Sequence, residues 1–209
     1  AAIIGVETRY GVVTGRRRVL DSLMTLSLEY PRRSKFFSSQ LKEFLILSSM
    51  GIVDPLEIKG SYAGAIGIPQ FMPTSYQAYA IDFDQDGYSD LVDSSVDAIG
   101  SVANYLKMHG WRAGEPIVKR LSPSEEEIVK DYVTKSLTAD VPLTVLVADG
   151  IEFSTHQFEN EKVGVIRLEY DGRHKYRIAY PNFFVLTRYN RSQNYAMTVF
   201  ELAEKIDPR

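Results

Sequence analysis

One carboxylate near the start of the chain has surroundings that suit acid–base chemistry. Glu7 lies in residues 4–11 (IGVETRYG), where apolar residues precede it in a segment that we predict to be helical. Burial among apolar side chains disfavours the charged form of a carboxyl group, so we expect the pKa of Glu7 to be raised to suit a general acid. Most glutamates in helices are merely solvated, and Glu7 therefore needs support from the rest of the sequence.

A second block, residues 60–76 (GSYAGAIGIPQFMPTSY), is crowded with small residues. Such residues let a backbone approach a bulky ligand closely, while Ser61 and Gln70 could supply hydrogen bonds. Phe71, Met72 and Tyr76 could supply faces for rings. Taken alone, the glycines are explained equally well by a close crossing of two helices.

Residues 82–88 (DFDQDGY) match the start of a calcium-binding loop of the EF-hand type. Asp82, Asp84 and Asp86 occupy loop positions 1, 3 and 5, a glycine at position 6 permits the sharp turn, and the backbone carbonyl of Tyr88 would be the ligand at position 7. A further acid should close the site, and the spacing leaves Asp93 and Asp97 as alternatives. The competing interpretation is a solvated acidic turn.

The elements that must position these residues are mainly helical. Apolar spacing of three and four predicts helices in residues 19–26 and 36–47, and a third over 95–109 that ends at Gly110. Alternating or β-branched runs predict strands in residues 141–147, 162–170 and 175–179, with a capped helix at 122–131 and turns at 149–150 and 171–172. A last helix is expected over 195–206. We predict an α+β, mainly α, chain with a helical core (1–110), a small β-rich insert (111–180) and a C-terminal segment (181–209) that rejoins the core.

Composition excludes several classes of protein. The sequence has no cysteine, which excludes disulfides and thiolate chemistry, and its formal net charge of -3 over 209 residues does not favour nucleic acid as a partner. No segment approaches the length of a membrane-spanning helix. His109, His156 and His174 lack metal-ligand spacing. The chain starts in an apolar run without Met, so we expect the natural protein to begin upstream, where a signal or lipid anchor would lie.

Taken in order, the motifs resemble the membrane-bound lytic murein transglycosylase B family, which has a lysozyme-like core. No single motif is decisive, and the resemblance rests on their order and spacing over nearly the whole chain. It is weakest from residue 115 to residue 177. The matching stretches are ETRYG (7–11), YPRR (30–33), GSYAGAIG (60–67), QFMPTSY (70–76), DAIGSVANY (97–105), PNF (181–183), TRYN (187–190) and YAM (195–197).

The resemblance implies a bacterial enzyme that cuts peptidoglycan glycan strands, with Glu7 as the sole catalytic acid and base. It also implies structural Ca²⁺ held in part by Asp97, and no organic cofactor. We expect a periplasmic monomer in the cell envelope, with possible anchoring in the outer membrane. The implied cleft residues are Ser61, Gln70, Met72, Arg32, Arg33, Tyr105, Arg188, Asn190 and Tyr195.

Ordinary glycosidases use two carboxylates, whereas no second acid accompanies Glu7 in the matched motifs. Asp21, Glu29, Asp54 and Glu57 fall more naturally at helix ends or turns. A lone acid suits substrate assistance, in which the family's product is a 1,6-anhydromuramyl end. The alternatives are a muramidase that admits water and a glycan-binding module without turnover.

Overall fold

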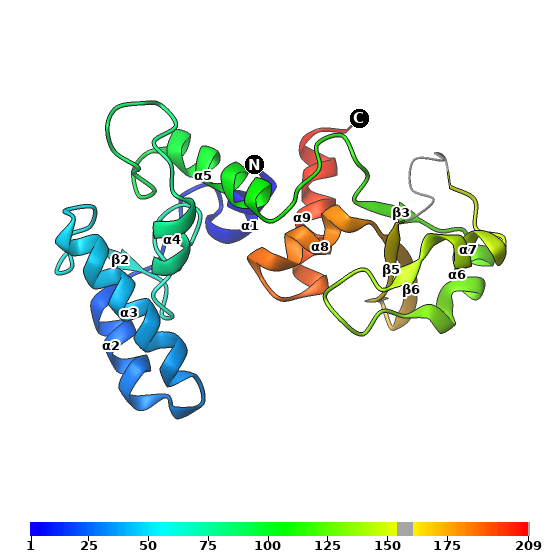
Figure 1. Cartoon of the computed structure of the whole chain (residues 1–209), viewed down its shortest axis with the longest axis horizontal. Coiled ribbons are helices and arrows are strands. Elements are labelled where there is room, and N and C mark those ends of the chain that lie inside the picture. The colour runs from blue at the N-terminus through cyan, green and yellow to red at the C-terminus, as the bar shows by residue number, and fades with distance from the viewer. Residues whose placement is uncertain (154–160, 209) are drawn as a thin grey trace. The chain divides into compact units, whose positions relative to one another are not determined.

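The computed structural model describes residues 1–153 and 161–208, so His156 lies outside the described residues. The chain divides into two compact units, Ala1–Tyr105 and Leu106–Arg209 (Figure 1). The expected return of residues 181–209 to the N-terminal core stays a prediction. The chain is mainly helical with small sheets. Within the described residues, no helix combines the length and the apolar character that crossing a membrane requires.

The N-terminal unit is helical apart from one two-stranded ribbon. Arg17 pairs with Gly60 and Arg18 with Lys59 in that antiparallel ribbon. Its elements are α1 (Ala2–Thr8), β1 (Arg17–Arg18), α2 (Val19–Glu29), a 3₁₀ turn (Pro31–Arg33), α3 (Ser34–Ser49), β2 (Lys59–Gly60), α4 (Pro73–Tyr79) and most of α5 (Ser95–Met108).

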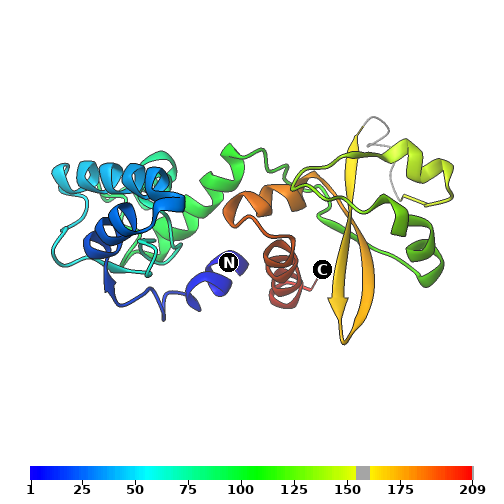
Figure 2. The same ribbon diagram turned by 90° about the horizontal axis from the view of Figure 1, so that it is seen from below.

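The core of this unit follows the apolar spacing of its helices. Helices α2 and α3 lie side by side as an antiparallel hairpin (Figures 1 and 2). Leu23 on α2 and Phe44 on α3 are both fully buried, and each fully buried large apolar side chain contributes about 1.5–3 kcal/mol. The predicted helices over 19–26, 36–47 and 95–109 are confirmed, including the left-handed stop at Gly110 with a φ of 91°.

The C-terminal unit is built on an antiparallel sheet of four strands in the order β3-β6-β5-β4. Its long hairpin runs in register from Gly164↔Ala179 to Tyr170↔Arg173. The hairpin turns at Asp171 and Gly172, both with positive φ, as a two-residue hairpin turn requires. The elements are β3 (Val118–Arg120), α6 (Pro123–Val129), a 3₁₀ turn (Lys130–Tyr132), β4 (Val141–Pro142), α7 (Leu143–Ala148), β5 (Lys162–Tyr170), β6 (Arg173–Ala179), α8 (Pro181–Tyr189) and α9 (Gln193–Ile206).

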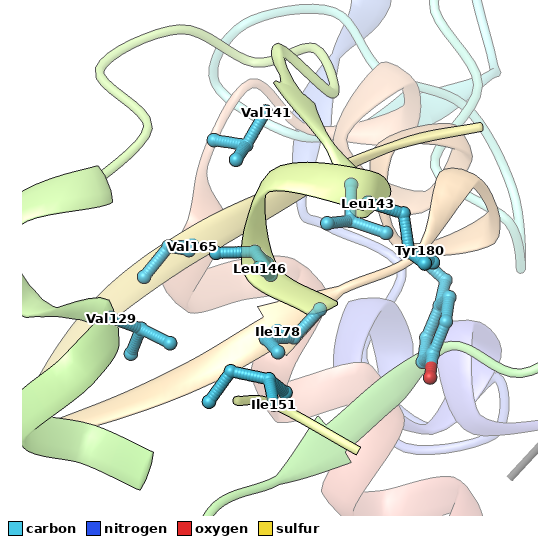
Figure 3. Packing of buried hydrophobic residues seen from close by; sticks show 9 residues of the cluster. Val129, Val141, Leu143, Leu146, Ile151, Val165, Ile178 and Tyr180 are labelled. Atoms are coloured by element: carbon cyan, nitrogen blue, oxygen red, sulfur yellow. The ribbon is translucent and has the colours of Figure 1, made fainter. Parts of the chain in front are cut away.

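One predicted strand is wrong. Residues 141–147 were expected to be extended, but only Val141–Pro142 pair with β5, and Leu143–Ala148 form α7. The reason is the spacing of buried side chains: Leu143 and Leu146 lie on one helical face and enter a cluster with Val165 of the sheet (Figure 3). Burial of that face outweighs the β preference of the valines.

The helix predicted near residue 122 is confirmed together with its cap. The Ser122 hydroxyl accepts the Glu125 backbone N–H, and the Glu125 carboxylate accepts the Ser122 backbone N–H at 2.8 Å. This reciprocal pair is a capping box, which satisfies two donors that a helix start otherwise leaves unpaired.

Candidate active site

Glu7 lies in the last turn of α1, a short helix whose Ile3 and Ile4 are buried. The Glu7 side chain itself is partly buried. Immediately after the helix the backbone passes through three successive left-handed residues: Arg9 (φ 50°), Tyr10 (φ 60°) and Gly11 (φ 89°). Non-glycine residues adopt this conformation at a cost of roughly 1–2 kcal/mol each, so surrounding contacts must hold the chain there.

Thr8 supplies such contacts. Its buried hydroxyl donates to the carbonyl of Ile68 at 2.8 Å and, more weakly, to that of Ile4 at 3.2 Å, and it accepts the N–H of Gly11 at 3.0 Å. One side chain therefore fastens the end of α1 to a segment sixty residues further along, and also closes the reversal that follows. The position of Glu7 is fixed relative to residues 60–76 by its neighbour.

Gln70 and Ser61 organise that segment from within. Gln70 has a left-handed φ of 53°, and its side-chain NH₂ donates to the carbonyls of Thr14 at 2.8 Å and Gly67 at 2.9 Å. The Ser61 hydroxyl oxygen accepts the backbone N–H groups of Ala63 and Ala65. The Gln70 side-chain oxygen accepts no hydrogen bond from the described residues, so it can accept one from a ligand.

The small residues of this block pack against the protein itself. A Cβ at Gly60 would lie 2.1 Å from the Ala65 carbonyl oxygen, and one at Gly64 would lie 2.4 Å from a methyl of Leu23. A Cβ at Gly67 would lie 2.2 Å from the carbonyl oxygen of Leu91. The glycines are therefore explained by close packing within the protein, although residues 61–72 form turns and not the crossing of two helices considered above.

The aromatic residues of the block belong largely to the core. Phe71 is 2% exposed and its ring lies 5.7 Å from that of Tyr105, which is itself 7% exposed. The Tyr76 hydroxyl donates to the carbonyl of Ser89 at 2.7 Å, and burial raises the pKa of Tyr76 to about 12. Met72 is only partly buried. Among these residues it has the most surface to offer a ligand.

Arg32 and Arg33 lie in the exposed 3₁₀ turn between α2 and α3. The Arg33 guanidinium lies 4.3 Å from the centre of the Phe36 ring and 5.2 Å from that of Phe37. A guanidinium held over ring faces keeps its charge while losing side-chain freedom. Arg33 therefore presents its positive charge from a position that the two rings restrict.

The remaining predicted cleft residues belong to the C-terminal unit. Arg188 and Asn190 are exposed at the end of α8, and Tyr195 is partly buried in the first turn of α9. The Tyr195 ring stacks on Tyr189 at 6.4 Å with an interplanar angle of 9°. Ser192 caps α9 by accepting the backbone N–H of Tyr195. The approach of these side chains to Glu7 stays a prediction.

The candidate calcium loop brings three carboxylates together. Asp82, Asp84 and Asp86 each offer an oxygen within 4.8 Å of the others, and Gly87 has the expected positive φ of 99°. Clustered exposed carboxylates on a tightly turned loop are the donor set that a hard cation such as Ca²⁺ requires. These residues fit the predicted ion.

Asp97 has a different environment from these three. It is fully buried, and its carboxylate accepts the backbone N–H groups of Phe83 at 2.8 Å and Asp90 at 2.9 Å, one at each oxygen. Asp97 therefore ties both ends of the loop to the start of α5. Asp93, the alternative closing acid, is exposed, and its backbone N–H donates to Asp90.

Three of the other carboxylates near Glu7 in the sequence have ordinary structural positions. Asp21 lies in the first turn of α2 and forms an ion pair with Arg18 at 2.8 Å. Asp54 accepts the N–H of Leu56 within a turn. Glu29 is exposed at the end of α2. The expected placement of these three at helix ends and turns is confirmed.

Comparison with known proteins relates this arrangement to one family. The family model described as Transglycosylase SLT domain matches residues 1–204. The membrane-bound lytic murein transglycosylase B of Escherichia coli strain K12 is 42% identical over 204 residues, covering 98% of this chain. The chain spans only 55% of the length of that relative.

Solved structures that resemble this chain are also lytic transglycosylases. The soluble lytic transglycosylase SltB1 from Pseudomonas aeruginosa is 46% identical with a TM-score of 0.87, covering 98% of this chain and 68% of that one. An Escherichia coli lytic transglycosylase in complex with calcium is 41% identical with a TM-score of 0.82, covering 97% and 63%. SltB3 from Pseudomonas aeruginosa, in complex with NAG-anhNAM-pentapeptide, is 34% identical with a TM-score of 0.81, covering 98% and 54%.

Proposed function

Because the chain belongs to the transglycosylase SLT domain family, we propose that it is a peptidoglycan lytic transglycosylase. It cleaves the β-1,4 bond between N-acetylmuramic acid and N-acetylglucosamine and leaves a 1,6-anhydromuramyl end. The observation that carries the proposal is Glu7, a partly buried carboxyl at the end of a helix that Thr8 fastens to the segment containing Ser61 and Gln70. A structure of the related SltB3 with an anhydro sugar supports the same product.

Glu7 acts first as the acid. The protonated carboxyl donates to the glycosidic oxygen as that bond breaks, while the N-acetyl oxygen of the muramyl sugar attacks its own anomeric carbon. No second carboxylate is needed, because the substrate supplies the nucleophile.

Glu7 then acts as the base. Its carboxylate accepts the proton of the sugar's C6 hydroxyl, and that oxygen attacks the anomeric carbon and displaces the N-acetyl oxygen. The 1,6-anhydro ring closes, Glu7 is protonated again, and no water is consumed. A water molecule in place of the C6 hydroxyl would give a reducing end, so exclusion of water from this step decides the product.

The proposed binding residues would orient the glycan strand. The Gln70 side-chain oxygen and the Ser61 hydroxyl would meet sugar hydroxyl or amide groups. Arg32 and Arg33 would meet carboxylate or carbonyl groups of the substrate. Met72, Tyr105, Arg188, Asn190 and Tyr195 complete the proposed binding residues.

Calcium would stabilise the N-terminal unit. Asp82, Asp84 and Asp86 would hold Ca²⁺ with the carbonyl of Tyr88, and a related structure contains calcium. Asp97 would close the site as a ligand, in addition to its hydrogen bonds with the loop. Bound there, the ion would supply positive charge that offsets repulsion among the aspartates, in a structural role.

The proposed setting is the bacterial cell envelope. The Escherichia coli relative is membrane-bound, and peptidoglycan is an extracytoplasmic polymer. We propose that the protein works in the periplasm as a monomer, on an insoluble substrate.

Mass spectrometry of muropeptides tests the proposal. Purified peptidoglycan is incubated with the protein, with Glu7→Gln, and with Glu29→Gln as a control that removes another carboxylate. Products lighter than the hydrolytic ones by one water, present with Glu29→Gln and absent with Glu7→Gln, are expected. Reducing ends would instead make it a muramidase, and failure of the unmodified protein to cleave would favour a binding module.

A further inference from the structure

A hollow of about 1120 Å³ lies within the C-terminal unit, and its lining includes none of the residues assigned above. One wall is the C-terminal half of α9, with Phe200 and Glu204, and the floor is the start of the sheet, with Val118 and Arg120. The third side is the loop from Trp111 to Pro116. Trp111 is the only tryptophan in the sequence.

The loop that carries Trp111 is held rigidly. Asn182, fully buried in the first turn of α8, accepts the backbone N–H of Arg112 at 2.9 Å and donates to the carbonyls of Arg112 at 2.8 Å and Glu115 at 3.2 Å. A buried amide with three hydrogen bonds to one loop fixes its shape before any ligand arrives. The wall formed by Trp111 is therefore pre-organised.

The opposite side of the hollow is fixed as well. Arg120 of β3 forms a two-pronged ion pair with Glu204 of α9, with one N–O distance of 3.0 Å. This pair bridges the sheet and the helix at the edge of the hollow. The cavity thus has two tethered walls and does not depend on a mobile segment for its shape.

Trp111 itself is partly buried, and only one of its two N–H groups has a hydrogen-bond acceptor in the described part of the chain. Its backbone N–H donates to Leu106, but its indole N–H has no acceptor and its ring has no aromatic partner in the described part of the chain. Phe200, also partly buried, lines the same space. Two rings with an available N–H donor offer a ligand both apolar faces and a directional hydrogen bond.

The charges around the rings narrow the class of ligand. The lining contains four acidic and two basic side chains, so carboxylate-rich or phosphate-rich ligands are disfavoured. Carboxylates and a guanidinium are suitable partners for hydroxyl groups, which both donate and accept. A neutral ligand with apolar ring faces and many hydroxyl groups matches this combination. The lining charges are Glu115, Arg120, Glu201, Glu204, Lys205 and Asp207.

We propose that the hollow lined by Trp111 and Phe200 is a second saccharide-binding site, which binds a neutral N-acetylglucosamine unit of the glycan strand through residues distinct from those of the proposed cleft. This inference rests on the proposed function, because it assigns the hollow to the same polymer. Such a site would keep the enzyme on an insoluble strand between cleavages. Its affinity is expected to be modest, with a Kd of roughly 0.1–1 mM, as for a small number of ring and hydrogen-bond contacts.

The single tryptophan gives a direct test. The fluorescence of Trp111 is titrated with tetra-N-acetylchitotetraose, using the full chain carrying Glu7→Gln to prevent turnover. A saturable change is expected. Adding Phe200→Ala should weaken binding roughly tenfold through loss of one ring, whereas adding Gln70→Ala, in the proposed cleft, should leave the titration unchanged. Val147→Ala, an exposed apolar residue of the same unit outside the hollow, is the matched control.

Each other outcome overturns the inference. No fluorescence change up to 10 mM tetrasaccharide, on the order of tenfold above the weakest expected Kd, excludes the site. A change lost with Gln70→Ala but kept with Phe200→Ala assigns the signal to the cleft. A response to tri-lysine and not to the saccharide makes the hollow a cationic-peptide site. Muropeptide release by the unmodified protein is measured in parallel, so failure of the enzyme function is seen separately.

Discussion

Removing the Thr8 hydroxyl is the clearest test of whether local geometry positions Glu7 for catalysis. Thr8→Val keeps the size and branching of the side chain but removes the donor to Ile68 and the acceptor for Gly11. A buried polar group left without a hydrogen-bond partner lowers the free energy of unfolding by about 1–3 kcal/mol. Because the region around Gly11 is only partly buried, we expect the free energy of unfolding to fall by about 2–4 kcal/mol in total.

For a chain of this size, about 2–4 kcal/mol corresponds to a fall in Tm of roughly 5–15 °C. The effect on catalysis is expected to be larger than a loss of folded protein explains. A displacement of a catalytic group by about 1 Å can lower kcat by roughly a hundredfold, so Thr8→Val should lower kcat by between about tenfold and a hundredfold under conditions where it remains folded.

Thr8→Ser is the matched control, because it keeps the hydroxyl and loses one methyl, at a cost of about 1 kcal/mol. Thermal unfolding by circular dichroism and initial rates of peptidoglycan clearing are measured on both variants. Equal stability and equal rates for Thr8→Val and Thr8→Ser would refute the argument that this hydroxyl positions Glu7.

Two further predictions concern carboxylates whose roles the structure separates. Asp97→Asn places an NH₂ group against one of two backbone N–H donors, so it should lower Tm both with calcium and with EGTA. Asp84→Asn should lower Tm only with calcium. A wild-type Tm for Asp97→Asn in EGTA would contradict the role of Asp97 as a buried hydrogen-bond acceptor. The Lys119 ammonium and then the Ser122 N–H lower the pKa of Glu125 below its usual 4.5, so this carboxylate stabilises the fold above pH 4.5 and loses that contribution as pH falls through the lowered pKa. Urea unfolding of Glu125→Gln should show a deficit of about 0.5–1 kcal/mol near pH 7 that closes in acid, and a deficit independent of pH would count against the assignment.

Helices were predictable where a single set of apolar residues repeats at helical spacing and is also the set that the fold buries. The stripe that includes Leu23 and the one that includes Phe44 each have a single consistent period, and the two helices bury them against each other. The run over 141–147 was not predictable in the same way. Its β-branched residues favour a strand, while the three-residue spacing of Leu143 and Leu146 favours a helix, and only the neighbouring sheet decides between them.

The residue types of the candidate site were predictable from the sequence, but the hydrogen bonds that hold those residues in place were not. The pattern around Glu7 indicated an acid, and three alternate aspartates indicated a metal loop, because both signals are local. The bond from Thr8 to Ile68 and the bond from Gln70 to Thr14 each join positions more than fifty residues apart, and no periodicity encodes such pairs. A threonine at the end of an apolar helix was the only local hint of the first.

The segment between Thr8 and Gly15 is held at both ends by the same stretch of chain. Thr8 is bonded to Ile68, and the backbone at Gly15 lies so close to Gly60 that a Cβ would be 2.0 Å from its carbonyl oxygen. Surface loops ordinarily accept insertions and deletions. Here an added or missing residue could not be absorbed without breaking one attachment, so homologous sequences should keep the same number of residues between these positions.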